Sequence, residues 1–507
     1  MKFNYLFYIA IINISSFFSL TENNDTIRFA FILSRTGSHS PSKLKQINSE
    51  NYKDIFGYNW LGENELTKVG KRQQFYLGCW SNYKYKNILI SETYHPKDLL
   101  SRSSECNKTI QSSYAYLHGL YQNSAITLTN NQIDNAIPPL NSNKGYIDAK
   151  NKLDENKFVL PDNIQIVPVH TFYEKAHNYL LEKVDNCPSI KKFYEEGELM
   201  AKKKKEEILY YKADNNDKTY GELLTEIINE EKIFDEIYNI NSLLNNSTLF
   251  RIIAETFICD YFNGVNLDKF IQKNIDIYKL LQMFEEYFGE ISIGGGLNND
   301  LNGERKNKTY ELSQKVNYDL FNGLLEWTKI RIDNDIENNF DIKLYESPKL
   351  VIYLSHHESV ESLYYFLKET FNIKNLKNPL YVNFTSFIAI ELYRKNNNKD
   401  IYDYNDFYIK LFYDNKQIGD DILYNEFYDK VKDKIITFDE LEEYCGISQK
   451  DINLKTQSST LKYEIIGILL ICIFPVLASI SALIYFGRKK NNFDELPEDN
   501  NNNNNEK

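Results

Sequence analysis

Short apolar runs rich in Ile, Val, Phe and Tyr recur along this chain in two groups, and amphipathic stretches alternate with them. Polar, Gly or Pro residues bound each run, which is typical of buried β-strands. The predicted strands cover residues 26–34, 87–91, 164–170, 349–355, 385–395 and 407–413. Helical periodicity is strongest over residues 65–80, 108–121 and 359–371. This alternation predicts an α/β fold with a mostly parallel sheet flanked by helices.

Between the two groups of strands the pattern becomes helical and charged, with few strand signals from Thr171 to about Gly289. It predicts an inserted, mainly helical cap over residues 171–300. A Gly- and Asn-rich connection follows at residues 294–303. The α/β core is accordingly expected in two parts, residues 21–170 and residues 301–445.

Two further apolar runs lie near the ends of the chain. Residues 1–20 have a charged start, an apolar middle and a polar exit, and therefore predict a secretory signal peptide, with an uncleaved anchor as the alternative. Residues 465–486 contain no charge and, at about 1.5 Å per residue, are long enough to span a bilayer. A polar stalk precedes this run at residues 446–464.

The predicted span fixes a topology. Arg488, Lys489 and Lys490 follow it directly, which places the tail of residues 487–507 in the cytosol. We therefore expect a single-pass type I membrane protein of the secretory pathway, at the plasma membrane or in a lysosome-like compartment. Several sequons would be usable on the luminal side, among them those at Asn24, Asn107, Asn246, Asn307 and Asn383.

Composition limits which kinds of partner and cofactor the chain is expected to bind. The formal net charge of -12 disfavours nucleic acid, because phosphate backbones are bound by clustered Lys and Arg. Five of the six cysteines precede the predicted span, so at least one is unpaired if the others form disulfides. No Cys or His spacing is typical of a zinc site, and neither a metal nor a cofactor is implied. The oligomeric state is left open.

Candidate chemistry lies where predicted strands end, which is where open α/β sheets place their sites. The first strand runs into a loop that reads Arg35-Thr36-Gly37-Ser38-His39-Ser40-Pro41. A second arginine, Arg102, follows another apolar stretch. The strand at residues 349–355 runs into His356-His357-Glu358. Guanidinium groups suit phosphate oxygens, and a carboxylic acid can protonate a leaving alcohol.

The order of these segments resembles the histidine acid phosphatase family, whose first loop reads Arg-His-Gly-x-Arg-x-Pro and whose site ends in a His-Asp or His-Glu pair. Further segments match the family in order: Leu66-Thr67 with Gly70, Gln74 and Leu77-Gly78; Arg102-Ser103-Ser104; Ala115 to Tyr121; Val167 to Thr171; and Asn186-Cys187-Pro188. The likeness covers residues 26–445 and is weakest through the cap.

The resemblance implies a role for each matching position. Arg35 and Arg102 match phosphate-binding arginines, and His357 matches the phosphate-contacting histidine. Glu358 stands at the position of the proton donor. Thr36, however, replaces the histidine nucleophile, and His39 replaces the second arginine of the loop.

These two replacements predict that hydrolysis by the family mechanism is abolished or severely reduced. A hydroxyl attacks phosphorus poorly without an adjacent base, and loss of an arginine weakens stabilisation of the transferring phosphoryl group. The expected function is binding of a phosphorylated small molecule or phosphoester. Two alternatives stay open, namely an active acid phosphatase with a rearranged nucleophile and a structural or adhesion surface glycoprotein.

Overall fold

The computed structural model describes thirteen segments of the chain: residues 25–43, 58–122, 126–136, 159–160, 164–171, 187–213, 217–230, 240–265, 276–289, 304–337, 347–373, 382–396 and 401–446. The predicted signal peptide, most of the stalk, the membrane span and the tail lie outside these residues. Within the described segments, no helix combines the length and hydropathy that crossing a bilayer requires. The chain forms two compact units, residues 1–437 and 438–507. The second contains helix α19, Phe438–Cys445.

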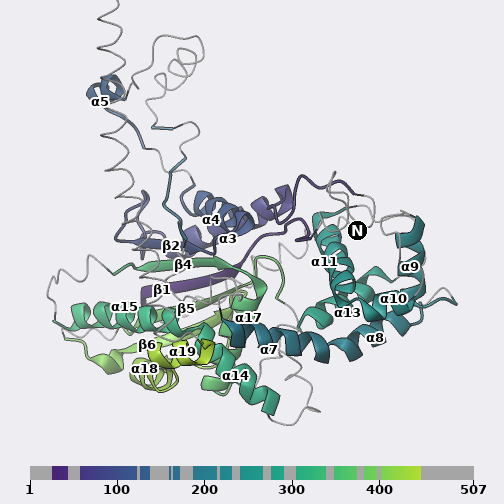
Figure 1. The fold of residues 1–507 in the computed structure, drawn as a ribbon. Coiled ribbons are helices and arrows are strands. Elements are labelled where there is room, and N and C mark those ends of the chain that lie inside the picture. The colour runs from purple at the N-terminus through teal and green to yellow at the C-terminus, as the bar shows by residue number, and fades with distance from the viewer. Residues whose placement is uncertain are drawn as a thin grey trace, which may run out of the picture. The chain divides into compact units, whose positions relative to one another are not determined.

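One mixed β-sheet forms the centre of the first unit (Figure 1). Its order is β3-β2-β4-β1-β5-β6-β7, with β8 also paired to β6. The strands are β1 Thr26–Arg35, β2 Leu99–Ser103, β3 His170–Thr171, β4 Leu350–Ser355, β5 Phe387–Arg394, β6 Phe407–Tyr413, β7 Lys416–Gln417 and β8 Ile422–Leu423.

The prediction of a mostly parallel sheet is corrected to a mixed one. Strands β3, β2, β4 and β1 are parallel neighbours, whereas β5 pairs antiparallel with β1 and β6 pairs antiparallel with β5. A parallel neighbour needs a long crossover, usually a helix. Only the short 3-10 helix η4, Tyr404–Asp406, is described between β5 and β6, so the chain returns antiparallel.

Two of the predicted strands also differ from the structure. Residues 87–91 form a turn with one isolated bridge between Lys86 and Ile90, and the strand forms instead at Leu99–Ser103. Asn87 has a φ of 65°, a left-handed conformation that interrupts an extended run. Of residues 164–170, only the last belongs to a strand.

Helices cover both faces of the sheet (Figure 1). Alternate side chains of β1, such as Ala30 and Ile32, pack with residues of α3 (Lys68–Tyr85) and α4 (Asn107–Leu120). The preceding residue, Phe29, contacts Trp327 of α15 (Tyr318–Glu337), on the opposite face. α17 (His357–Thr370) contacts β1 and β5, and α18 (Tyr424–Lys432) contacts β6. The period-two alternation of β1 thus builds two separate hydrophobic layers.

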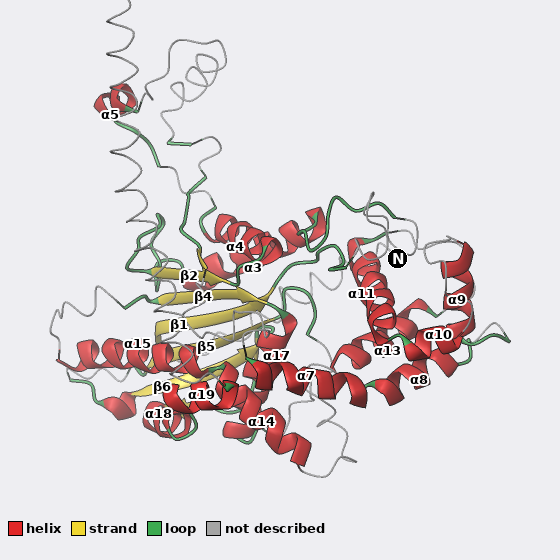
Figure 2. Cartoon of the chain, in the orientation of Figure 1, coloured by secondary structure: helices red, strands yellow, loops and turns green. Residues whose placement is uncertain are grey.

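The helices described between residues 188 and 289 are called the cap helices below. The described part of this region has no strand, only one isolated bridge between Lys212 and Thr219 (Figure 2). The cap helices are α7 Pro188–Met200, α8 Lys202–Tyr210, α9 Tyr220–Glu230, α10 Ile240–Asn245, α11 Ser247–Asn263 and α13 Ile277–Gly289. Their hydrophobic core centres on Phe250, Phe257 and Phe284 and is separate from the core between the sheet and α3 and α4. Two further helices are α5, Asn130–Asn135, and α14, Glu304–Val316.

Candidate functional site

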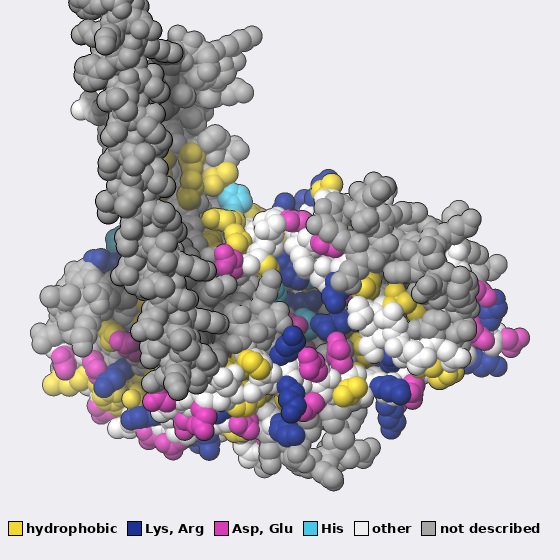
Figure 3. Space-filling model, viewed as in Figure 1, with side chains coloured by type: hydrophobic (Ala, Val, Ile, Leu, Met, Phe, Trp, Pro, Cys, Tyr) yellow, Lys and Arg dark blue, Asp and Glu magenta, His cyan; other side chains and the backbone are white. Residues whose placement is uncertain are grey.

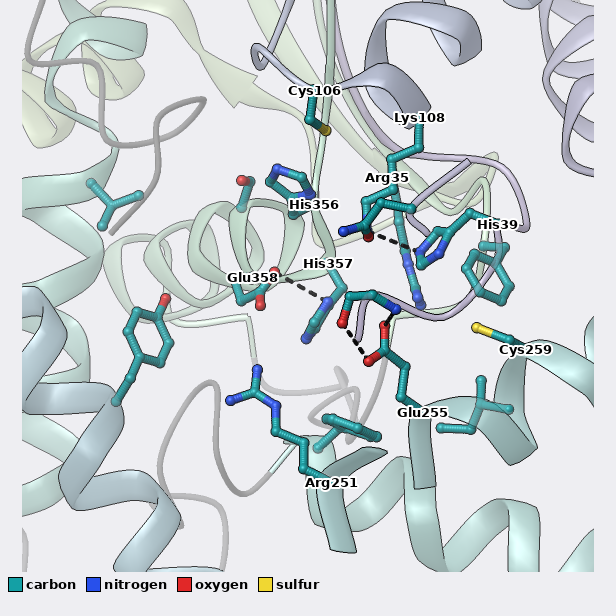
Figure 4. Close-up of a pocket in the computed structure, with 18 of the residues that line it drawn as sticks. Arg35, His39, Cys106, Lys108, Arg251, Glu255, Cys259, His356, His357 and Glu358 are labelled. Atoms are coloured by element: carbon teal, nitrogen blue, oxygen red, sulfur yellow. Dashed lines mark hydrogen bonds and ion pairs between the residues drawn. The ribbon is translucent and has the colours of Figure 1, made fainter. Parts of the chain in front are cut away.

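A cavity of about 470 Å³ lies at the carboxyl ends of the parallel strands, where the cap helices face the sheet. Lys and Arg side chains gather around a hollow in this face of the molecule (Figure 3). Its polar lining comes mainly from the loop after β1, the start of α4, the start of α17 and helix α11. Sequence segments that are far apart therefore meet at one site (Figure 4).

The loop after β1 is held in place by α3 and α4. Thr67, the N-cap of α3, donates its hydroxyl proton to the carbonyl oxygen of Ser38 at 2.9 Å. The amide of Gln74 donates to the carbonyl of Arg35 at 2.7 Å, and the backbone N–H of Gly37 donates to Ser112 at 3.2 Å. Thr67 and Gln74, which belong to one of the matching sequence segments, thus hold the loop in place, and their side chains bind its backbone rather than a ligand.

Close packing of two glycines sets the distance between this loop and α3. A Cβ atom at Gly37 would lie 2.3 Å from the carbonyl oxygen of Gly70, and one at Gly70 would lie 2.0 Å from the carbonyl oxygen of Ser38. Neither contact is possible with a side chain present. The glycines therefore let the loop backbone lie directly on the helix.

Arg35 borders the cavity and is buried. Its Nη1 donates to the carbonyl oxygen of Val382. Its guanidinium carbon lies 4.1 Å from the centroid of the Phe384 ring, which fixes the plane of the group. A held arginine of this kind is suited to binding phosphate oxygens.

His39 also borders the cavity, and its hydrogen bonds define its tautomer. Nδ1 lies 2.8 Å from the carbonyl oxygen of Ser40, so it carries the proton and donates it. Nε2 lies 3.2 Å from Nζ of Lys108 and accepts from that ammonium. Burial and the positive charge of Lys108 hold the pKa of His39 well below its usual value of 6.5. The imidazole is therefore neutral even in mild acid.

Thr36 is buried, with 1% of its surface exposed, and is not among the described residues that line the cavity. Its backbone N–H donates to Ser355, and its carbonyl oxygen accepts from the N–H of Thr385. The residue at the predicted nucleophile position thus links β1 to its neighbours through its backbone.

His357 and Glu358 both border the cavity and interact with each other, with His357 Nδ1 3.1 Å from Glu358 Oε2. Burial lowers the pKa of His357 to about 3, with Arg35 and Arg251 acting in the same direction. Burial opposes ionisation of Glu358, but the neighbouring histidines, a backbone hydrogen bond and Arg251 outweigh it and lower its pKa below the usual 4.5. Glu358 is thus a carboxylate over most of the pH range.

Arg102 is not brought to the cavity with the other predicted residues. Its Nη1 donates to the Tyr353 hydroxyl at 2.8 Å and lies 3.7 Å from Oδ2 of Asp319 on α15. In the sheet, Arg102 of β2 is paired with Tyr353 of β4, whereas Arg35 of β1 is paired with Ser355. Arg102 therefore lies two residues further from the carboxyl end of β4 than Arg35 does. In this arrangement its guanidinium binds a tyrosine and an aspartate.

Several cavity residues were not predicted from sequence. Lys108 stands on the first turn of α4, Arg251 and Glu255 project from α11, and His356 and Cys106 precede α17 and α4 respectively (Figure 4). Lys108 and Cys106 lie just beyond the Arg102-Ser103-Ser104 segment, so their place after an apolar stretch and this motif was a usable signal. No sequence signal identifies Arg251, because its position depends on the packing of the cap helices.

Arg251 brings a cation from the cap helices into the cavity. Its Nη1 lies 2.9 Å from Oε1 of Glu198 on α7, and the acidic groups Glu358, Glu255 and Glu198 raise its pKa. Within the described segments, no group of three or more His, Cys, Asp or Glu side chains is arranged to hold a metal ion. The positive charge that faces a ligand here is supplied by Arg35, Lys108 and Arg251, and the carboxyl groups of Glu255 and Glu358 border the same cavity.

An α/β sheet with a cation-lined cavity at the ends of β1 and β4 is the architecture that the first-loop and His-Glu motifs predicted. The family model of the histidine phosphatase superfamily, branch 2, matches residues 21–414. The chain therefore belongs to this superfamily.

Individual relatives match only segments of the chain. A lysosomal acid phosphatase of Xenopus laevis is 27% identical over 173 residues, which cover 34% of this chain and 32% of the relative. A putative acid phosphatase 5 of Caenorhabditis elegans is 29% identical over 102 residues, covering 20% and 22%. Both matches thus span a third or less of the relatives' own length.

Among solved structures, a phytase of Klebsiella sp. ASR1 has a TM-score of 0.46 and 10% identity, covering 82% of this chain and 97% of that chain. This likeness is too loose to add to the family assignment.

Proposed function

We propose that this chain is a histidine acid phosphatase-like ectodomain that binds a phosphorylated ligand and whose hydrolytic activity is lost or severely reduced. The proposal rests on one observation, namely that the side chains able to bind phosphate border the cavity and the residue at the nucleophile position does not. Arg35, Lys108 and Arg251 border the cavity, whereas Thr36, at the position of the nucleophile, does not. Three cations can hold a phosphate dianion, but binding alone does not break its ester bond.

The proton-donor position supports the same conclusion. A general acid must hold its proton at the working pH, which enzymes achieve by raising the pKa of a carboxyl group. The pKa of Glu358 is lowered instead. A carboxylate at this position interacts with His357 and Arg251 and has no proton to give a leaving alcohol.

The decisive experiment restores the two family residues. We expect Thr36→His combined with His39→Arg to create phosphatase activity, absent from the parent protein, on an aryl phosphate, whose phenolate leaving group departs with little help from a general acid such as Glu358. A thermal-shift titration with vanadate is expected to stabilise both proteins, because the remaining cations are unchanged. Turnover by the parent protein that disappears in Glu358→Ala would contradict the proposal.

One observation favours hydrolysis as a second candidate function. His39 is neutral, its proton is held on Nδ1 by Ser40, and its Nε2 lone pair is directed at Lys108 in the cavity. An imidazole in this state is a nucleophile once Lys108 is drawn away by an anion. Acid-quench labelling would then give a phosphoenzyme at His39 that is absent from His39→Gln, whereas background labelling in both proteins would exclude this candidate.

The membrane topology is part of the proposal. The predicted signal and span, together with local similarity to a protein named lysosomal acid phosphatase, support a luminal ectodomain in the secretory pathway, at the plasma membrane or in a lysosome-like compartment. Asn107 and Asn383, at two predicted sequons, are exposed. Endoglycosidase treatment of the full-length protein is expected to increase its electrophoretic mobility on a denaturing gel, and an unchanged electrophoretic mobility would count against this topology.

An adhesion or structural role remains the third hypothesis. It differs from the proposal in requiring no ligand in the cavity. If neither vanadate, phosphate nor a phosphoester shifts the melting temperature, the adhesion hypothesis gains over the binding proposal.

A further inference from the structure

A cluster of nucleophilic and basic side chains lies on the cavity wall where α4 and α17 begin, and neither the family resemblance nor the proposed function uses it. It consists of Cys106, Thr109, Ser104 and His356, and the cavity cation Lys108 follows Cys106 by two residues, in the first turn of α4. Both Cys106 and His356 border the cavity (Figure 4). Cys106 is half-buried and carries a free thiol.

The contacts of Cys106 favour the thiolate. Its sulfur lies 3.1 Å from Oγ1 of Thr109, and Ser104 lies between the sulfur and the His356 ring. Ser104 Oγ lies 3.3 Å from Nε2 of His356 and 4.0 Å from the sulfur. Cys106 is also the N-cap of α4, where unpaired backbone N–H groups favour negative charge.

Electrostatics agrees with this geometry. Burial favours the thiol, but the hydrogen bonds and charges of His356, with Thr109 and Lys108, outweigh it and lower the pKa of Cys106 to about 6. The other free thiols among the described residues behave oppositely. Burial raises the pKa of Cys79, and it raises that of Cys259 well above 9.0, with Glu255 and Asp260 in support.

We propose that Cys106 and His356 form a nucleophilic pair that makes Cys106 a site of S-thiolation by low-molecular-weight disulfides, and that this modification closes the anion cavity. The Cys106 thiolate attacks one sulfur of the disulfide, a new S–S bond forms with the protein, and the original S–S bond breaks. The second half of the reagent departs as a thiolate and takes a proton from His356 or solvent. No other oxidant or reductant is needed.

Occlusion follows from position. Cys106 borders the same cavity as Arg35, Lys108 and Arg251, so a group attached to its sulfur occupies space that a phosphorylated ligand would fill. A peptide-sized adduct such as glutathione also adds carboxylates beside these cations. This second part rests on the proposed anion binding, whereas the reactivity of Cys106 does not.

The test of reactivity uses the full-length protein and its own thiols as controls. Iodoacetamide is applied across a pH series, and peptide mass spectrometry follows the alkylation of Cys106, Cys79 and Cys259. We expect Cys106 alkylation to rise with a midpoint near pH 6, far below that of the other two. His356→Gln should move this midpoint upward, and Cys79→Ser should leave it unchanged. A Cys106 midpoint at or above that of Cys79 would overturn the inference.

The test of occlusion treats the protein with glutathione disulfide and then titrates it with vanadate in a thermal-shift assay. We expect a mixed disulfide at Cys106 and loss of the vanadate shift, with both effects absent in Cys106→Ser and reversed by dithiothreitol. A fully thiolated protein that still responds to vanadate would refute closure of the cavity. If untreated protein and Cys106→Ser both fail to respond, anion binding itself is wrong, and Cys106 alkylation alone decides the reactivity claim.

Discussion

A single contact at the residue scale, between Lys108 and His39, determines whether an imidazole in the cavity can react. The ammonium of Lys108 is 3.2 Å from Nε2 of His39 and occupies the lone pair that would attack phosphorus. The same lysine can also bind a phosphate. Ligand binding and release of the histidine are therefore linked through one side chain.

We predict that Lys108→Met raises the pKa of His39, because a positive charge next to the imidazole is removed. The pKa should stay below 6.5, since burial is the larger cause of its depression. NMR titration of ¹³C-labelled histidines measures this, with His39→Gln used to assign the signal. Lys71→Met, at an exposed position on α3, is the matched control. An unchanged His39 titration in Lys108→Met would mean that the contact does not persist in solution.

At the scale of elements, glycines let helix α3 lie close to two neighbours, the loop after β1 and helix α4. Gly70 lies against the loop after β1, and Gly78 lies against α4, where an added Cβ would be 2.0 Å from the carbonyl oxygen of Tyr116. Gly119 of α4 makes the reciprocal contact, with a Cβ 2.1 Å from the carbonyl oxygen of Phe75. The two contacts differ in that only Gly70 lies against the loop that carries His39.

Gly70→Ala and Gly78→Ala are therefore expected to have similar costs and different effects. Each should lower the free energy of unfolding by about 1–3 kcal/mol, the usual range for overpacking. Only Gly70→Ala should also weaken vanadate binding, because the displaced loop carries Arg35 and His39. Denaturant unfolding and thermal-shift titration measure the two effects. Equal loss of vanadate binding in both variants would show that helix separation, and not the loop, controls the site.

At the scale of the whole molecule, the burial of His357 makes stability depend on pH. His357 has a folded-state pKa of about 3 against 6.5 for an unperturbed histidine. Between these values the unfolded chain binds a proton that the folded protein does not, so stability falls as pH falls. The loss begins near pH 6.5, and this group contributes no further change below about pH 3.

We predict that His357→Gln flattens the stability profile in this window, by up to about 1.4 kcal/mol per pH unit, the limit for one proton. Melting temperatures measured from neutral to acid pH provide the test. His95→Gln, which alters an exposed histidine, should leave the profile parallel to that of the parent. The same parallel profile in His357→Gln would show that His357 does not remain neutral in the folded protein.

The sequence by itself determined the α/β class, the positions of β1, β4, β5 and β6 to within a few residues, and the family. These elements have strong local signals, since buried strands are continuous apolar runs and the Arg35 loop has a fixed order of residue types. The prediction of a strand at residues 87–91 was wrong because Asn87 adopts a left-handed conformation in an otherwise strand-like run. The prediction of a mostly parallel sheet was wrong for β5 and β6, because the direction in which two strands pair depends on the path of the chain between them and not on the residues of either strand.

Only the tertiary structure decided which side chains share the cavity. Sequence order predicted that Arg35, His39, His357 and Glu358 belong together, and all four border it. It also placed Arg102 there, but the register of β2 and β4 sets Arg102 beside Tyr353 and Asp319. Lys108, Arg251 and Cys106 enter through packing between helices remote from one another in the chain. Strand and helix patterns record local periodicity, whereas the composition of a cavity is a property of three-dimensional proximity, which no local pattern encodes.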